Sequence, residues 1–182
     1  FSLNKKNKKL LHSFVSGYQN AVADYRTFIA STEKQDRLNL RNFSESNFGS
    51  PKEQYSFDGK KYSKSSLNYL LGLSFLQSNL DKKFNPKIIL EIGGGYGTLG
   101  EILKKSNLKN FKYINVDVAP IISFSKLYLS KVFNIKKIKS FKQFDRWKTI
   151  SVTKLNKINF FCPWQLKKLK DKISLFVNFI SF

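Results

Sequence analysis

The sequence is poor in the residues that build disulfides and metal sites. Its 182 residues contain one cysteine, Cys162, one histidine, His12, and no methionine. A single cysteine excludes an intramolecular disulfide framework and argues against a cysteine-based zinc site, and a single histidine leaves no cluster for another metal. We therefore expect no metal. No apolar run approaches the roughly 20 residues of a membrane-spanning helix, so the pattern predicts no transmembrane segment.

Acidic residues are scarce as well. The chain has 33 Lys and Arg against 12 Asp and Glu, which gives a formal net charge of +21. Only 4 of the basic residues are arginine, while Asn and Ile are abundant and Ala is rare, a bias that AT-rich codons produce. A surface that reads bases or phosphates is expected to use Arg for bidentate contacts. We interpret the charge mainly as compositional drift and expect no specific nucleic-acid partner, whereas a weak attraction to anionic glycans or lipid headgroups stays compatible with it.

The two ends of the sequence predict a fragment. The chain begins at Phe1 rather than Met, and the apolar run over 173–182 stops without a following element. We expect a chain cut at both ends, with the C-terminal strands of its domain missing. The first 11 residues are rich in Lys and Asn and lack the apolar core and cleavage site of a signal peptide, so a cytoplasmic location is expected.

The hydrophobic pattern divides the chain after residue 86. Residues 1–86 are predicted to be mainly helical, with helices over 13–30 and 65–80 and an irregular connection rich in Asn, Ser and Gly over 38–59. Ser63 and Ser66 are candidate N-caps of the second helix.

From Lys87 onward the pattern predicts alternating strands and helices. The expected strands cover 87–92, 110–118, 158–162 and 173–182, and the expected helices cover 98–105, 120–133 and 163–169. Residues 136–157 are ambiguous, with a short strand suggested at 138–141 before a surface loop. Alternating strands and helices are typical of βαβ units and a parallel sheet.

A cluster of glycines follows the first of these strands. Five of the chain's nine glycines fall between residues 93 and 100. At a strand-to-helix turn, glycines let the backbone approach a ligand closely and leave N–H groups free at a helix N-terminus. Gly95 to Gly100 spells GxGxxG, but a dinucleotide site places its first glycine directly at the strand end, two residues earlier. A bare turn needs only one or two glycines.

The spacing fits better to a Glu-x-Gly-x-Gly-x-Gly loop, which is typical of S-adenosylmethionine (SAM) methyltransferases. Its candidate cofactor-binding residues are Glu91, Gly93, Gly94, Gly95 and Gly97. SAM carries an ammonium and a sulfonium, so a carboxylate at the strand end favours it, directly or through water. After the second strand, Asp117 stands where a carboxylate of a doubly wound sheet accepts hydrogen bonds from ribose hydroxyls. The predicted cofactor is SAM.

Four segments resemble the bacterial sugar O-methyltransferases, class I SAM-dependent enzymes associated with surface-polysaccharide and glycan biosynthesis. These segments are ILEIGGGYGTLGEIL, YINVDVAP, FFCPWQLKKL and SLFVNFISF, within a similarity that begins near Tyr62. The resemblance implies an α/β fold with a Rossmann-like doubly wound sheet: a truncated SAM-binding domain over 87–182 after the helical region 1–86. It also implies a sugar or glycan as the methyl acceptor.

The resemblance adds further site residues after the third and fourth strands. Trp164 is a candidate for stacking on adenine, with a core position as the alternative, and Asn178 and Ser181 stand where cofactor and substrate meet, with strand capping as the alternative. A sugar hydroxyl needs a general base. His12 lies in a basic tail and Asp145 is better explained as a solvated charge, so the catalytic residue stays unassigned and is expected beyond the end of the chain.

A second hypothesis belongs to another class. A non-catalytic Rossmann-like binding module could use its Lys-rich face to hold an anionic glycan or a nucleic acid. Glu91 and Asp117 favour the enzyme, because a scaffold that had lost SAM would have little reason to keep both carboxylates. The oligomeric state is not predicted by any pattern in the chain.

Overall fold

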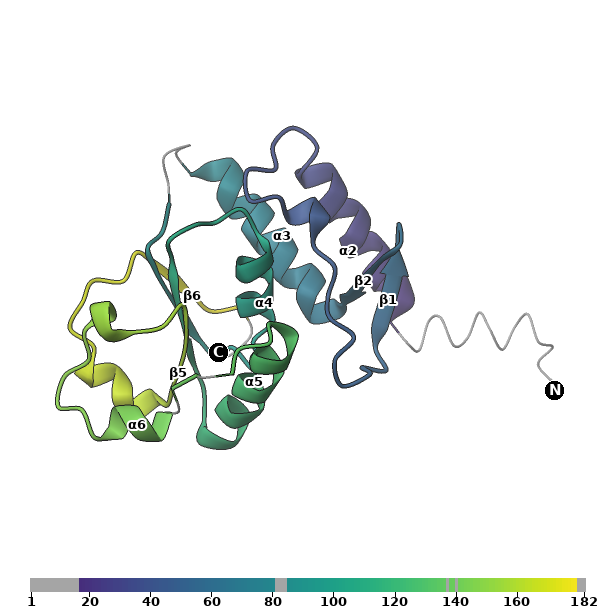
Figure 1. Ribbon diagram of the computed structural model, residues 1–182. Coiled ribbons are helices and arrows are strands. Elements are labelled where there is room, and N and C mark those ends of the chain that lie inside the picture. Colours follow the sequence, from purple (N-terminus) through teal and green to yellow (C-terminus); the bar gives the residue numbers. More distant parts are fainter. Residues whose placement is uncertain (1–16, 81–84, 137, 140, 180–182) are drawn as a thin grey trace. The chain divides into compact units, whose positions relative to one another are not determined.

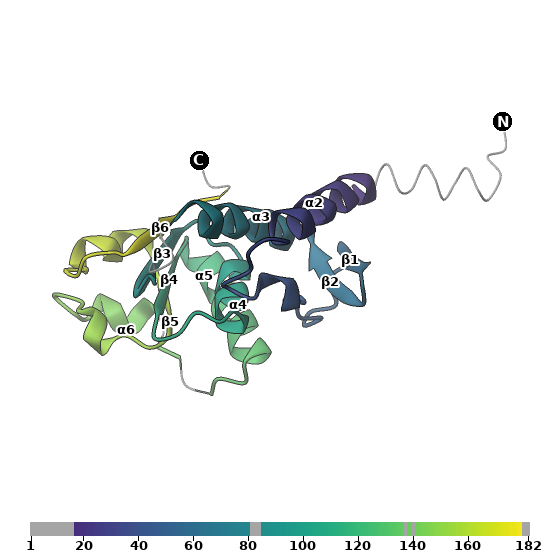
Figure 2. The ribbon, with the colours of Figure 1, turned by 90° about the horizontal axis from the view of Figure 1, so that it is seen from above.

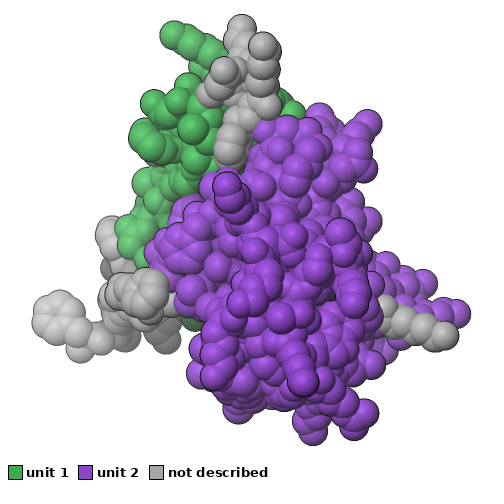
Figure 3. All heavy atoms as spheres, turned by 90° about the vertical axis from the view of Figure 1, so that its left-hand side faces the viewer, with its two compact units in different colours: residues 1–80 green, residues 81–182 purple. Residues whose placement is uncertain are grey.

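The chain forms two compact units, residues 1–80 and 81–182, which Figure 3 shows in different colours. The computed structural model describes residues 17–80, 85–136, 138–139 and 141–179. The boundary predicted from the sequence lies slightly later, after residue 86. None of the helices within the described ranges has the length and hydropathy of a membrane span.

Unit 1 contains two helices and a β-hairpin. The helices are α2 (Tyr18–Ser31) and α3 (Lys64–Asn79), and the hairpin consists of β1 (Gln54–Phe57) and β2 (Lys60–Ser63), preceded by the 3-10 helix η1 (Leu40–Asn42). Both helices are confirmed to within two residues of their predicted ends wherever those ends are described; residues 13–16 lie outside the described residues. Ser63 is the N-cap of α3, since its Oγ accepts a hydrogen bond from the Ser66 N–H at 3.1 Å.

The irregular connection predicted over 38–59 is wrong in its last part, which forms β1 and the hairpin turn. Asp58 and Gly59 adopt φ of 47° and 73°. Two successive positive φ values match the tight turns that suit the right-handed twist of paired strands. Aromatic packing fixes the hairpin, because Tyr25 of α2 stacks on Phe57 with 4.7 Å between ring centroids and donates a hydrogen bond to Asp58 at 2.7 Å.

Unit 2 is built on a four-stranded parallel sheet with the order β5-β4-β3-β6; Figure 1 labels the two outer strands, β5 and β6, and Figure 2 labels all four. The strands are β3 (Ile88–Ile92), β4 (Lys112–Val116), β5 (Ile158–Phe161) and β6 (Leu175–Val177). Chain order therefore runs outward from β3 to β5 and then reverses, so that β6 pairs with the free edge of β3. This is the strand order of the first part of a Rossmann fold. The predicted α/β class with a parallel sheet is confirmed.

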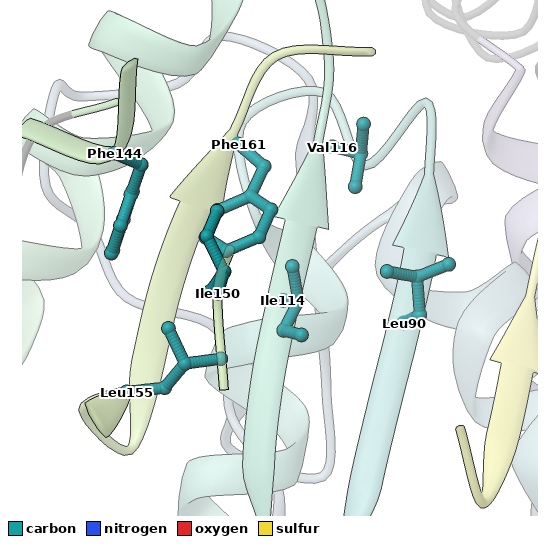
Figure 4. Close-up of a cluster of buried hydrophobic side chains, with 7 residues drawn as sticks. All are labelled: Leu90, Ile114, Val116, Phe144, Ile150, Leu155 and Phe161. Carbon is teal, nitrogen blue, oxygen red and sulfur yellow. The ribbon is translucent and has the colours of Figure 1, made fainter. Parts of the chain in front are cut away.

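Helices cover both faces of this sheet. Figure 2 shows α4 (Thr98–Lys105) and α5 (Ala119–Val132) on one face, and α6 (Phe141–Asp145) on the other with the 3-10 helix η3 (Pro163–Lys168). The α6 face buries a hydrophobic cluster (Figure 4) made of Leu90, Ile114, Val116, Phe144, Ile150, Leu155 and Phe161. The sheet is thus doubly wound, as predicted.

The strand suggested over 138–141 is wrong for the residues that the structure describes. Ile138 and Lys139 belong to no strand, and Phe141 begins α6. One helical turn is enough to bury Phe144, whose ring lies 4.7 Å from that of Phe161. Burial of one aromatic side chain therefore outweighs the weak strand propensity of this segment.

Candidate cofactor site

The glycine loop, Gly93–Gly97, connects β3 to α4 at the point where the strand order reverses. Gly93, Gly95 and Gly97 have φ of 74°, 51° and 94°, a left-handed backbone that other residues adopt with strain. The Gly93 N–H donates to the Val116 carbonyl at 2.8 Å, which ties the loop to the end of β4. The loop conformation therefore depends on glycine at these positions.

Gly94 is required for a different reason, because the loop rests on buried polar side chains. A Cβ at Gly94 would lie 2.5 Å from Asn115 Oδ1 and 2.6 Å from Glu91 Oε2. Both of these side chains are fully buried. By contrast, a Cβ at Gly95 would meet nothing within 4 Å, so the outer side of the loop is open. The inner side of the loop contacts buried side chains of the protein, whereas its outer side is accessible.

The side chains of Glu91 and Asn115 form the floor of the loop, and two buried hydrogen bonds fix their positions. The Tyr113 hydroxyl donates to the Glu91 carboxylate, and Asn115 Nδ2 donates to Ser125 Oγ of α5 at 2.8 Å. All four side chains are fully buried. In this conformation Glu91 lies buried beneath Gly94 and contacts the loop, so its binding of a cofactor, directly or through water, stays a prediction.

Asp117 stands directly after β4 and contacts the glycine loop. Its Oδ2 accepts a hydrogen bond from the Gly95 N–H at 2.9 Å, and its Oδ1 accepts one from the Val118 N–H at 2.7 Å. The carboxylate is only half-buried. Because a carboxylate has about four acceptor positions, two remain for hydroxyl groups of a ligand. The structure thus brings together the loop and the carboxylate that the sequence paired.

The two remaining predicted residues also follow strands at the same edge of the sheet. Trp164 is 50% exposed, which excludes the core position considered as its alternative, and its Nε1 donates to Asp145 Oδ1 at 3.0 Å. Gln165 Nε2 donates to the same oxygen at 2.6 Å. Asp145 therefore joins α6 to η3. Asn178 follows β6 directly and is half-buried.

Sequence reasoning missed three residues of this site: Tyr113, Asn115 and Ser125. The sequence signal is a polar residue, Asn115, inside an otherwise apolar strand; the pairing of Tyr113 and Asn115 with Ile89 and Glu91 of β3 is visible only in the structure. A polar residue inside an apolar strand indicates a buried partner, because an unpaired buried amide is costly.

Cys162 offers no nucleophile at neutral pH. The thiol is fully buried at the end of β5, and burial, together with the nearby carboxylates of Asp145 and Asp117, raises its pKa to about 11. Among the described residues no group of three His, Cys, Asp or Glu side chains is arranged to hold a metal ion. His12 and Ser181 lie outside the described residues.

Fold and site together define a Rossmann-type α/β unit with a glycine loop and a strand-end carboxylate at its switch point. Among solved structures, the chain is similar to a protein-L-isoaspartate O-methyltransferase, with 14% identity and a TM-score of 0.33, over 83% of this chain and 41% of that one. The chain therefore spans less than half the length of that protein. No family model and no curated protein matches, so the resemblance to sugar O-methyltransferases stays a prediction.

Proposed function

We propose that this chain is the cofactor-binding part of a SAM-dependent methyltransferase. The observation that supports it best is the contact between Asp117 and the glycine loop, with 2.9 Å between Asp117 Oδ2 and the Gly95 nitrogen. It joins a carboxylate that can accept hydroxyl protons to a loop whose outer side is open. Ligands of doubly wound sheets bind at the carboxyl ends of the strands, where the strand order reverses.

The residues present fit SAM in three respects. The open side of Gly95 leaves room for close approach of a ligand, and Asp117 keeps acceptor positions for ribose hydroxyls. Val118 and Trp164, which are 54% and 50% exposed, offer apolar surface for an adenine ring at the same edge.

The chemistry follows from the cofactor. When bound, SAM supplies a methyl group on a sulfonium for transfer to a nucleophile. The residues of this chain would bind and orient the cofactor: the glycine loop the methionine part and Asp117 the ribose. Holding the reacting atoms in line contributes much of the rate of such a displacement. We assign no general base.

The finer proposal concerns the acceptor. We infer a sugar or glycan hydroxyl, with a role in surface-polysaccharide or glycan biosynthesis, from the motifs GTLGEIL and PWQL, which resemble those of the sugar O-methyltransferases. A location in the cytoplasm and the absence of a specific nucleic-acid partner belong to the same proposal.

Calorimetry with SAM and with NAD tests the cofactor. We expect SAM to bind and NAD not to bind. Asp117→Asn should weaken SAM binding at least tenfold, because it removes the charge and turns an acceptor into a donor that faces the Gly95 N–H. Glu53→Gln, an exposed carboxylate in unit 1, is the matched control and should leave the affinity unchanged. Binding of NAD alone would identify a dinucleotide site, and binding of neither would favour the non-catalytic module.

A further inference from the structure

A second concave site lies in unit 2 and contains none of the residues of the cofactor site. It is a cavity of about 530 Å³ between the second half of α5, the segment that follows it, α6 and the residues before β5. Its polar lining consists of Lys126, Ser130, Lys136, Lys139, Gln143 and Asn156. We call it the lysine pocket.

The lysine pocket and the cofactor site share no residue. Asn156 precedes β5, whereas the glycine loop and Asp117 follow their strands. Helix α5 begins next to Asp117 and ends beside the pocket, and 14 residues of α-helix extend roughly 20 Å. Competition with SAM therefore tests whether a ligand in the lysine pocket leaves the cofactor site free.

The charge of the pocket has one sign. Among the residues that the structure describes, three lysines line it and no carboxylate does. Within the described residues, Lys126 and Lys136 take part in no ion pair or hydrogen bond. A bound anion with two or more charges would be attracted by all three lysine side chains.

The third lysine is already positioned. Lys139 Nζ donates to the Lys154 carbonyl at 2.8 Å and lies 5.0 Å from the centroid of the Trp147 ring. An ammonium has three donors, so Lys139 retains two for a ligand. A side chain held in this way loses less entropy on binding than a free surface lysine does.

Size and lining indicate the class of ligand. Cavities of roughly 300 to 1,000 Å³ hold small molecules of nucleotide size, which is far more than one phosphate needs. Ser130, Gln143 and Asn156 add neutral polar groups, and Ile135 and Ile138 add apolar wall. We propose that the lysine pocket binds a phosphorylated small molecule, with Lys126, Lys136 and Lys139 on a diphosphate group.

Calorimetry with uridine diphosphate and with inorganic pyrophosphate tests this proposal, independently of the proposed function. Uridine diphosphate is preferred to an adenine nucleotide, since adenine could enter the cofactor site. The double variant Lys126→Gln/Lys136→Gln should weaken binding of both probes at least tenfold. The matched control is Lys109→Gln/Lys172→Gln, two exposed lysines of the same unit that lie outside the lining and remove the same charge.

Three results would overturn the proposal: no binding of either probe at 100 mM salt, an equal loss in both double variants, or displacement of uridine diphosphate by SAM. The first denies a site, the second shows general attraction to a basic surface, and the third places the ligand in the cofactor site. Tighter binding of uridine diphosphate than of pyrophosphate would support contacts beyond the phosphates, and equal affinity would restrict the site to the diphosphate group. Unchanged thermal unfolding of the unliganded variants serves as the folding control.

Discussion

Gly94 and Gly95 are neighbours, yet glycine is needed at each for a different physical reason. At Gly95 the space for a side chain is open and the constraint is the backbone, with φ of 51°. At Gly94 the backbone has no positive φ and the constraint is contact, since Asn115 and Glu91 fill the space that a Cβ would take. The structure shows crowding by the protein itself at Gly94.

Gly94→Ala should therefore destabilise the fold and impair the cofactor site together. Overpacking typically costs about 1–3 kcal/mol, and relief requires the loop to rise from its floor. We expect a loss of this size in urea unfolding and at least a tenfold weaker SAM affinity. Gly49→Ala is the control, because its Cβ would meet nothing within 4 Å and its φ of 84° imposes backbone strain alone. A Gly94→Ala protein with unchanged SAM affinity would contradict the role assigned to the floor.

Cys162 predicts a pH dependence of stability. The folded thiol has a raised pKa of about 11, while an unfolded cysteine ionises near 9. Between these values the unfolded state releases a proton that the folded state keeps, so the free energy of unfolding falls as the pH rises from 9 towards 11. The slope from one such group is at most about 1.4 kcal/mol per pH unit. Cys162→Ala should lose this part of the slope, as measured by urea unfolding at pH 8, 9 and 10.

Reaction of the thiol gives an independent check. A fully buried thiol with a pKa of about 11 should react with an alkylating reagent at pH 8 only when the protein opens. Rapid alkylation of the native protein, at the rate of the urea-unfolded chain, would mean that Cys162 is accessible and that its environment differs from the one described.

At the scale of secondary-structure elements, the sequence pattern predicts helices and strands that have a regular hydrophobic period. It misses elements that depend on a few specific contacts. The helix over 98–105 and the strand over 158–162 follow from periodicity and end within a residue of the prediction. The β1–β2 hairpin was missed because its strands are short and weakly apolar, although Asp58-Gly59 is a strong turn signal. The run over 173–182 is largely apolar, yet among its described residues β6 pairs over Leu175–Val177 and Phe176 is 54% exposed.

The candidate cofactor site could likewise be predicted only in part from the sequence. The glycine positions and Asp117 could be predicted, because their spacing relative to strand ends fixes them at one edge of a parallel sheet. The burial of Glu91 could not, since it depends on Tyr113 and Asn115 of the neighbouring strand and on the register that aligns them. Spacing along one strand does not indicate which side chains of the next strand lie beneath a loop.

The hydrogen bond from the Tyr113 hydroxyl of β4 to the Glu91 carboxylate of β3 predicts a specific effect of Tyr113→Phe. Removing a donor from a buried carboxylate costs about 1–3 kcal/mol. Because Glu91 lies beneath Gly94, the loss should also weaken SAM binding. Tyr128→Phe is the matched control: Tyr128 donates to Glu101, another fully buried carboxylate, at 2.6 Å, but that pair joins α5 to α4. We expect similar losses of stability and weaker SAM binding only in Tyr113→Phe. Equal SAM affinities in both variants would reduce the Tyr113 bond to a purely structural one.

At the scale of the whole molecule, the net charge of +21 comes mostly from basic residues that lie outside the two sites. Of the four arginines, Arg37 and Arg41 serve the interior of unit 1: Arg37 Nη2 donates to the Leu80 carbonyl at 3.1 Å, and Arg41 Nη2 donates to the Ile29 carbonyl at 2.6 Å. The surface charge is therefore almost entirely lysine. Lysine binds phosphate as a point charge and lacks the planar fork with which arginine reads guanine.

This distribution predicts weak, unselective binding to nucleic acid. Each phosphate contact releases a counterion, and log K falls with log salt by about 0.9 per contact on duplex DNA. With several lysine contacts, we expect the affinity for a 20-base-pair duplex to drop more than a hundredfold between 50 and 200 mM salt, and two duplexes of different sequence to bind equally at every salt concentration. Fluorescence anisotropy measures both quantities. Uridine diphosphate, held by few charges in a formed cavity, should lose much less affinity over the same range. A duplex preferred tenfold over another at 150 mM salt would mean that the lysine surface reads sequence and that the charge has a function of its own.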